Sequence, residues 1–147
     1  MAKRILVPLD ETVQAENVLD MVADMARGAG ATVRLLHVAP APDNVVSDGR
    51  VVAYADQEGA RLESEGLDYL RAVEVRMNGF PVESAVRFGD PLEEILADAE
   101  AFGADLIVVS TRAASGISRV MLGSVAEHVL RKAAPAVMLF RGTREAA

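Results

Sequence analysis

The chain has 147 residues, a formal net charge of −7 and no cysteine, and 51% of its residues are hydrophobic. This composition predicts one globular domain, residues 1–147, that buries a core without a metal or a disulfide. The lack of cysteine excludes thiol catalysis and cysteine-ligated metals, and the acidic charge argues against nucleic acid as a partner. No apolar run approaches the roughly 18 residues of a membrane span, and the first residues lack the apolar region of a signal peptide. We therefore expect a cytoplasmic protein that does not bind a membrane.

The first part of the chain alternates strand patterns with a helical one. Lys3–Leu9 is a nearly continuous apolar run, as in a buried strand, and Thr32–Val38 is a second such run. Between them, apolar residues recur at helical spacing from Val13 to Met25. Asp43–Ala53 has no clear period, and we expect it to form a long mobile loop.

The middle of the chain continues the alternation. Tyr54–Met77 has an apolar stripe at helical spacing among many charges, which predicts a helix with one solvated face. Val82–Phe88 reads as a third strand. Asp90 precedes Pro91 as a helix cap would, and an apolar stripe follows as far as Phe102.

The last part holds the pattern most suggestive of a binding site. Leu106–Val109 is an apolar run, and Ser110–Gly116 is a turn of mostly small residues before a helix that ends near Lys132. Phosphates bind where a helix begins, because backbone N–H groups and the helix dipole point at the anion there. An ordinary strand-to-helix connection is the simpler interpretation of such a pattern taken alone. Ala136–Phe140 is a fifth strand.

Strands that alternate with helices predict an α/β fold, a single doubly wound parallel sheet of five strands with helices on both faces. Ligands of such sheets bind beyond the carboxyl ends of the strands, where the strand order reverses. If the first and fourth strands are neighbours there, Asp10 and the Ser110–Ser124 loop face one crevice. Asp10 is then a ligand of a ribose hydroxyl or a metal, or alternatively an exposed turn residue or a helix cap.

Other constellations do not carry a function. Gly28-Ala29-Gly30 resembles the start of a dinucleotide fingerprint, but it ends a helix and Val33 stands in the third glycine position. His37 and His128 lie far apart in sequence, and a structural role is expected for both. We find no catalytic residues and no metal ligands, and therefore expect that the protein is not an enzyme.

Three stretches resemble the universal stress protein family, and the resemblance covers essentially the whole chain. They are KRILVPLDETVQAENVLD from Lys3, LLHVAP from Leu35, and above all ADLIVVSTRAASGISRVMLGSVAEHVLRKAAPAVMLF from Ala104. The resemblance implies the strand order 3-2-1-4-5 and a homodimer built on the fifth strand. It also implies ATP, with magnesium, as the expected ligand of the crevice, because many members of the family bind ATP there, although others do not.

The resemblance also assigns roles to single residues. Asp10 would contact the ribose, and Gly123, Ser124 and Val125 would bind the phosphates. The backbone near three apolar residues would face adenine: Pro8, Leu9 and Val38.

The family's nucleotide signature is only half present. Gly123-Ser124 keeps its end at the right spacing, but Ser110 and Ala113 stand where the family has its first two glycines. If those glycines need a positive φ, a β-carbon there costs about 1–2 kcal/mol. Arg112 is a cation, and we expect it to offset part of this loss by contacting a phosphate.

Two functions remain open. The first is a regulatory homodimer that senses ATP or a related adenine nucleotide in the stress response, without turnover chemistry. The second is a universal stress protein that does not bind ATP and acts through contacts with an unknown protein partner.

The dimer is expected through Ala136–Phe140, because this edge strand carries no charge, whereas Glu83 and Arg87 protect the opposite edge.

Overall fold

Five strands form the main sheet in the order β5-β2-β1-β6-β7, and every pair of neighbours runs parallel. The computed structural model describes residues 3–11, 16, 18–43, 45–47, 49–110, 131, 132 and 134–140, and every structural statement below concerns these residues. The five strands are β1 (Arg4–Pro8), β2 (Thr32–Ala39), β5 (Val82–Phe88), β6 (Leu106–Ser110) and β7 (Ala136–Phe140). Numbered along the chain, they stand in the order 3-2-1-4-5, so the predicted doubly wound α/β fold is confirmed.

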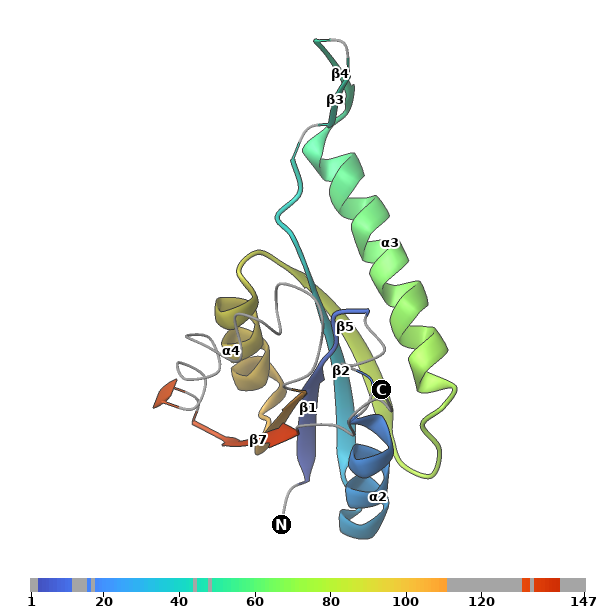
Figure 1. Ribbon diagram of the computed structural model, residues 1–147, viewed down its shortest axis with the longest axis vertical. Helices are drawn as coiled ribbons and strands as arrows, with labels where there is room; N and C mark the ends of the chain where they lie inside the picture. Colours follow the sequence, from blue (N-terminus) through green and yellow to red (C-terminus); the bar gives the residue numbers. More distant parts are fainter. Residues whose placement is uncertain are drawn as a thin grey trace, which may run out of the picture.

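Helices lie against both faces of this sheet (Figure 1). The helices α2 (Leu19–Ala29) and α3 (Ala55–Glu74) pack on one face, and α4 (Pro91–Phe102) packs on the other. Successive side chains of a strand point to opposite faces. Ile5 and Val7 of β1 therefore join the core beneath α2 and α3, while Leu6 joins the core beneath α4.

The helix ends follow local signals in the sequence. α2 ends at Gly30, whose φ of 68° is left-handed and whose N–H donates to the carbonyl of Ala26. At the start of α4, the side chain of Asp90 accepts a hydrogen bond from the backbone N–H of Glu93 at 3.0 Å, and Pro91 occupies the first turn. These ends confirm the predictions, because caps depend only on residues within one turn. The predicted helix between β6 and β7 lies outside the described residues, apart from its end at 131 and 132.

The prediction of a long mobile loop over Asp43–Ala53 was wrong. This stretch forms an antiparallel hairpin of β3 (Val45–Ser47) and β4 (Arg50–Ala53), in a second sheet of its own. Gly49 in the turn has a φ of 74°, a conformation that glycine adopts without strain. The signal was in the sequence: two pairs of valines flank Asp48-Gly49, a dipeptide typical of tight hairpin turns.

The helix α3 extends well beyond the sheet and carries this hairpin at its far end (Figure 1). Its fully buried residues are Gly66, Leu70 and Val73, all in the C-terminal half. At Gly66 the helix comes so close to the sheet that a β-carbon would lie 2.9 Å from Cγ2 of Val86 and 3.2 Å from Cδ2 of His37. Glycine at this position therefore sets the distance between α3 and strands β2 and β5.

We expected the charges of the edge strand β5 to protect this edge from pairing with another chain. Instead they form ion pairs within the protein. Arg87 reaches beneath α4, where its guanidinium pairs with Asp98 and Glu94, and Glu83 pairs with Arg34 of the neighbouring strand. Asp98 is completely buried.

Within the described part of the chain, no helix is long and apolar enough to cross a membrane.

Candidate functional site

The strands β1 and β6 lie side by side at the centre of the sheet, with Ile5 opposite Leu106. The chain passes from β1 to β2 on one side, whereas β6 lies on the other side, so the strand order reverses between β1 and β6. The carboxyl ends of neighbouring parallel strands at such a reversal form the crevice in which doubly wound proteins bind ligands. The structure thus confirms the adjacency on which the predicted crevice depends.

The structure brings the described candidate residues to this end of the sheet. Pro8 ends β1, and Leu9 and Asp10 follow it directly. Val38 lies near the end of β2, in register with Arg87 of β5, and is buried. Ser110 is the last residue of β6 and is also buried, so it belongs to the strand and not to the turn in which we expected it.

The remaining candidates, Arg112, Ala113, Gly123, Ser124 and Val125, lie outside the described residues. Their assignment to the phosphates stays a prediction. The described part of the crevice is therefore its β1 and β2 side together with the end of β6.

The turn after β1 contains a strained residue that the sequence analysis did not single out. Glu11 has a φ of 69°, the one positive φ among the described residues other than glycine. Residues other than glycine pay about 1–3 kcal/mol for sparsely populated backbone conformations, and such residues cluster at functional sites. The strain lies next to Asp10, so this turn is held in a conformation that its own sequence does not favour.

His37 of β2 supports this turn from the neighbouring strand. Its Nδ1 lies 3.0 Å from the carbonyl oxygen of Leu9, within hydrogen-bond distance. The backbone N–H of Leu9 also donates to the carbonyl of Leu36 at 2.8 Å. The structural role expected for His37 is confirmed, and its partner is the backbone of a candidate site residue.

Carboxylates set the charge on the β1 side of the crevice. Burial raises the pKa of Tyr69 well above its usual range, and the nearby charges of Glu16, Asp10 and Glu11 raise it further. Three acidic side chains therefore lie within electrostatic range of one half-buried hydroxyl. This side of the crevice suits ribose hydroxyls or a cation, and it disfavours the phosphates themselves.

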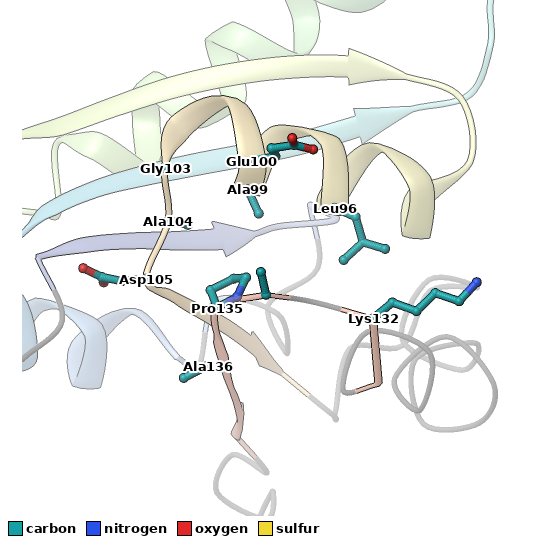
Figure 2. A pocket seen from close by; sticks show the side chains of 10 residues that line it. Leu96, Ala99, Glu100, Gly103, Ala104, Asp105, Lys132, Pro135 and Ala136 are labelled. Atoms are coloured by element: carbon teal, nitrogen blue, oxygen red, sulfur yellow. The ribbon is translucent and has the colours of Figure 1, made fainter.

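A cavity of about 720 Å³ lies at the opposite end of the sheet (Figure 2). It is bounded by the C-terminal half of α4, by the turn that leads into β6 and by the start of β7. Leu96 and Ala99 form an apolar wall, and the side chain of Glu100 points away from them (Figure 2). The cavity lies at the amino ends of β6 and β7, so it is distinct from the crevice.

In the described part of the chain, no three His, Cys, Asp or Glu side chains are grouped to hold a metal ion.

Comparison with known proteins decides the family. The model of the universal stress protein family matches residues 1–141. This chain belongs to the universal stress protein family. It is 28% identical over 148 residues to universal stress protein YxiE of Bacillus subtilis, and the match covers 96% of this chain and 100% of the relative.

Solved structures agree with this assignment. The structure of protein MJ0577, a universal stress protein of Methanocaldococcus jannaschii, matches with a TM-score of 0.75 and 27% identity, over 97% of this chain and 98% of that one. A universal stress protein from Archaeoglobus fulgidus, solved in complex with dAMP, has the same fold with a TM-score of 0.59 and 24% identity. That match covers 95% of this chain and 98% of the other chain.

Proposed function

We propose that this universal stress protein binds an adenine nucleotide, ATP in the first place, in the crevice between β1 and β6. One observation carries the proposal. Asp10 follows β1 and Ser110 ends β6, so both lie at the carboxyl ends of two neighbouring strands, where the strand order reverses. A universal stress protein of the same fold has been solved with dAMP, which supports an adenine nucleotide as the ligand class. The bound nucleotide would set the conformation or the partner choice of a regulatory protein in the stress response.

The charges of the crevice indicate how the nucleotide would lie. The turn after β1 carries Asp10 and Glu11, whose negative charge suits the hydroxyl groups of a ribose. The triphosphate would then extend toward the end of β6 and the Gly123-Ser124 region, away from these carboxylates. Magnesium bound to the phosphates would lower the remaining repulsion.

We also propose a homodimer through β7. This strand ends the sheet, and Leu139 within it is 41% exposed. Exposed apolar edge strands invite pairing with another chain, and pairing β7 with its own copy about a two-fold axis would satisfy both edges. The opposite edge, β5, carries the half-exposed charge of Glu83 and is less suited to such pairing.

A second candidate function is supported by the signature residues. Ser110 and Ala113 stand where the family signature has glycine, and the backbone needs room to approach phosphates closely there. In this alternative the protein does not bind ATP and acts through its dimer and an unidentified protein partner. Replacing Ala113 by glycine should tighten ATP binding if the β-carbon is the obstacle.

Isothermal titration with ATP and magnesium tests the two alternatives. We expect weak binding that Asp10→Asn weakens further, because the amide presents only one oxygen to the ribose hydroxyls. Asp20→Asn is the matched control, since Asp20 is exposed on α2. No heat and no thermal shift at millimolar ATP would overturn the nucleotide proposal in favour of the second function. Native mass spectrometry of the freshly purified protein would report a retained nucleotide and the dimer together.

A further inference from the structure

Tyr69 of α3 and Glu16 connect the long helix to the segment that follows β1. The hydroxyl of Tyr69 donates a hydrogen bond to Oε2 of Glu16 at 2.9 Å. Just beyond the C-terminal end of α3, Arg76 donates from Nη1 to Oε1 of the same carboxylate. The end of α3 and the turn after it thus hold both oxygens of Glu16.

The ring of Tyr69 also contacts the support on the other side of the turn. It meets the ring of His37 edge-on, with the centroids 6.1 Å apart and the planes at 68°. His37 in turn lies 3.0 Å from the carbonyl oxygen of Leu9. One side chain of α3 therefore contacts both His37, which supports the chain just before Asp10, and Glu16, which follows Asp10 by six positions.

The turn between these two supports needs to be held. Glu11 is in the left-handed region, with a φ of 69°, and this conformation persists only where surrounding contacts enforce it. The negative charges of Asp10, Glu11 and Glu16 also lie near this half-buried hydroxyl, and they raise the pKa of Tyr69 beyond the effect of burial. The hydroxyl thus remains a hydrogen-bond donor throughout the neutral pH range.

We propose that Tyr69 is a positioning residue of the nucleotide crevice: through Glu16 and His37 it holds the strained turn in which Asp10 faces the ribose. The inference rests on the proposed function, and it adds a residue outside the family's nucleotide signature. Tyr69 itself does not contact the nucleotide. It supports the side of the crevice at Asp10, where the ribose hydroxyls would bind, and does not affect the side where the phosphates would bind.

The test compares Tyr69→Phe with Tyr54→Phe. These are the two tyrosines of the chain, and Tyr54 is 60% exposed at the N-terminal end of α3. Affinities are measured for ATP and for 2′,3′-dideoxy-ATP, which lacks the hydroxyls that Asp10 would bind. We expect Tyr69→Phe to weaken ATP about tenfold, as when a hydrogen bond to a charged group is lost, and to leave the dideoxy analogue nearly unchanged. Tyr54→Phe should change neither affinity.

Hydrogen exchange of the nucleotide-free protein provides a readout that is independent of binding. Amides of residues 9–11 should exchange faster in Tyr69→Phe than in Tyr54→Phe, since the turn loses its support from α3. If Tyr69→Phe does not fold, Glu16→Leu removes the same contact from the other side and should accelerate the same amides.

The outcomes separate the two proposals. A wild-type protein that binds no adenine nucleotide overturns the proposed function, and the exchange data alone then decide the role of Tyr69. If the wild type binds ATP and Tyr69→Phe binds it equally well, the inference is wrong while the proposed function stands. Unchanged exchange over residues 9–11 in the variant overturns the inference in either case.

Discussion

Arg87 of β5 donates a hydrogen bond from Nε to Oδ1 of Asp98, on α4, at 2.8 Å. Asp98 is completely buried, and Arg34 of β2 contacts both oxygens of the same carboxylate, each at 3.0 Å. One carboxylate thus joins two strands and the helix that covers them. The nearby Asp98 raises the pKa of Arg87, which remains charged at every relevant pH.

Removing this carboxylate should destabilise the protein. We expect Asp98→Ala to lower the free energy of unfolding by about 3 kcal/mol, because two partly buried guanidinium groups then lose their buried partner and keep only the more exposed Glu83 and Glu94. Asp68→Ala is the control: Asp68 pairs with Arg71 on the exposed face of α3, and such surface pairs contribute less than about 1 kcal/mol. Urea denaturation measures both variants, and equal losses would contradict the importance of the buried pair.

The close approach of α3 to the sheet predicts opposite effects at two helical glycines. Gly66→Ala should cost about 1–3 kcal/mol, because the new β-carbon would lie 2.9 Å from Cγ2 of Val86. Gly28→Ala, within α2, meets nothing within 4 Å and should gain about 0.5–1 kcal/mol from helix propensity. Thermal unfolding distinguishes them, and a neutral Gly66→Ala would show that the contact relaxes freely.

Tyr69 predicts a loss of stability at alkaline pH. Its pKa is raised in the folded protein, first by burial and then by Glu16, so above pH 10 or so the unfolded chain releases this proton more readily than the folded one. The folded state then binds more protons, and the free energy of unfolding falls as the pH rises. Denaturation across this range should show a steeper fall for the wild type than for Tyr69→Phe. Parallel curves for the two proteins would refute the shift.

The proposed dimer predicts that a charge on β7 separates the subunits. Leu139→Lys should yield a monomer or a precipitate, since a cation would lie in an edge that pairs with its own copy. Val75→Lys is the matched control, because Val75 is 77% exposed and lies at the end of α3, away from this edge. Light scattering at micromolar concentration measures both variants, and a monomeric wild type would exclude the dimer.

Any hydrolysis of ATP should be slow enough to be incidental. Phosphoryl transfer needs a metal clamp, a positioned water and a cation at the transferring oxygens. On the described side of the crevice, Asp10 and Glu11 supply negative charge near the expected ribose instead. Phosphate release is the measurement, and turnover at the roughly 1–100 per second of kinases would contradict a purely regulatory role.

The sequence by itself determined the elements whose signals are local, together with the order of the strands. The bounds Val82–Phe88 and Ala136–Phe140 agree with the structure, because an apolar run between turn residues is complete within a few positions. The strand order came from the resemblance of whole stretches to one family, and it placed Asp10 and Ser110 at the same end of the sheet.

Only the tertiary structure decided which polar groups meet. Asp98 falls on the apolar stripe of its own helix, and its partner Arg34 lies 64 positions away along the chain. Tyr69 and Glu16 are separated by 53 positions, and the positive φ of Glu11 has no signature in its own side chain. Such contacts depend on how helices settle on the sheet, which packing decides and local sequence patterns do not encode.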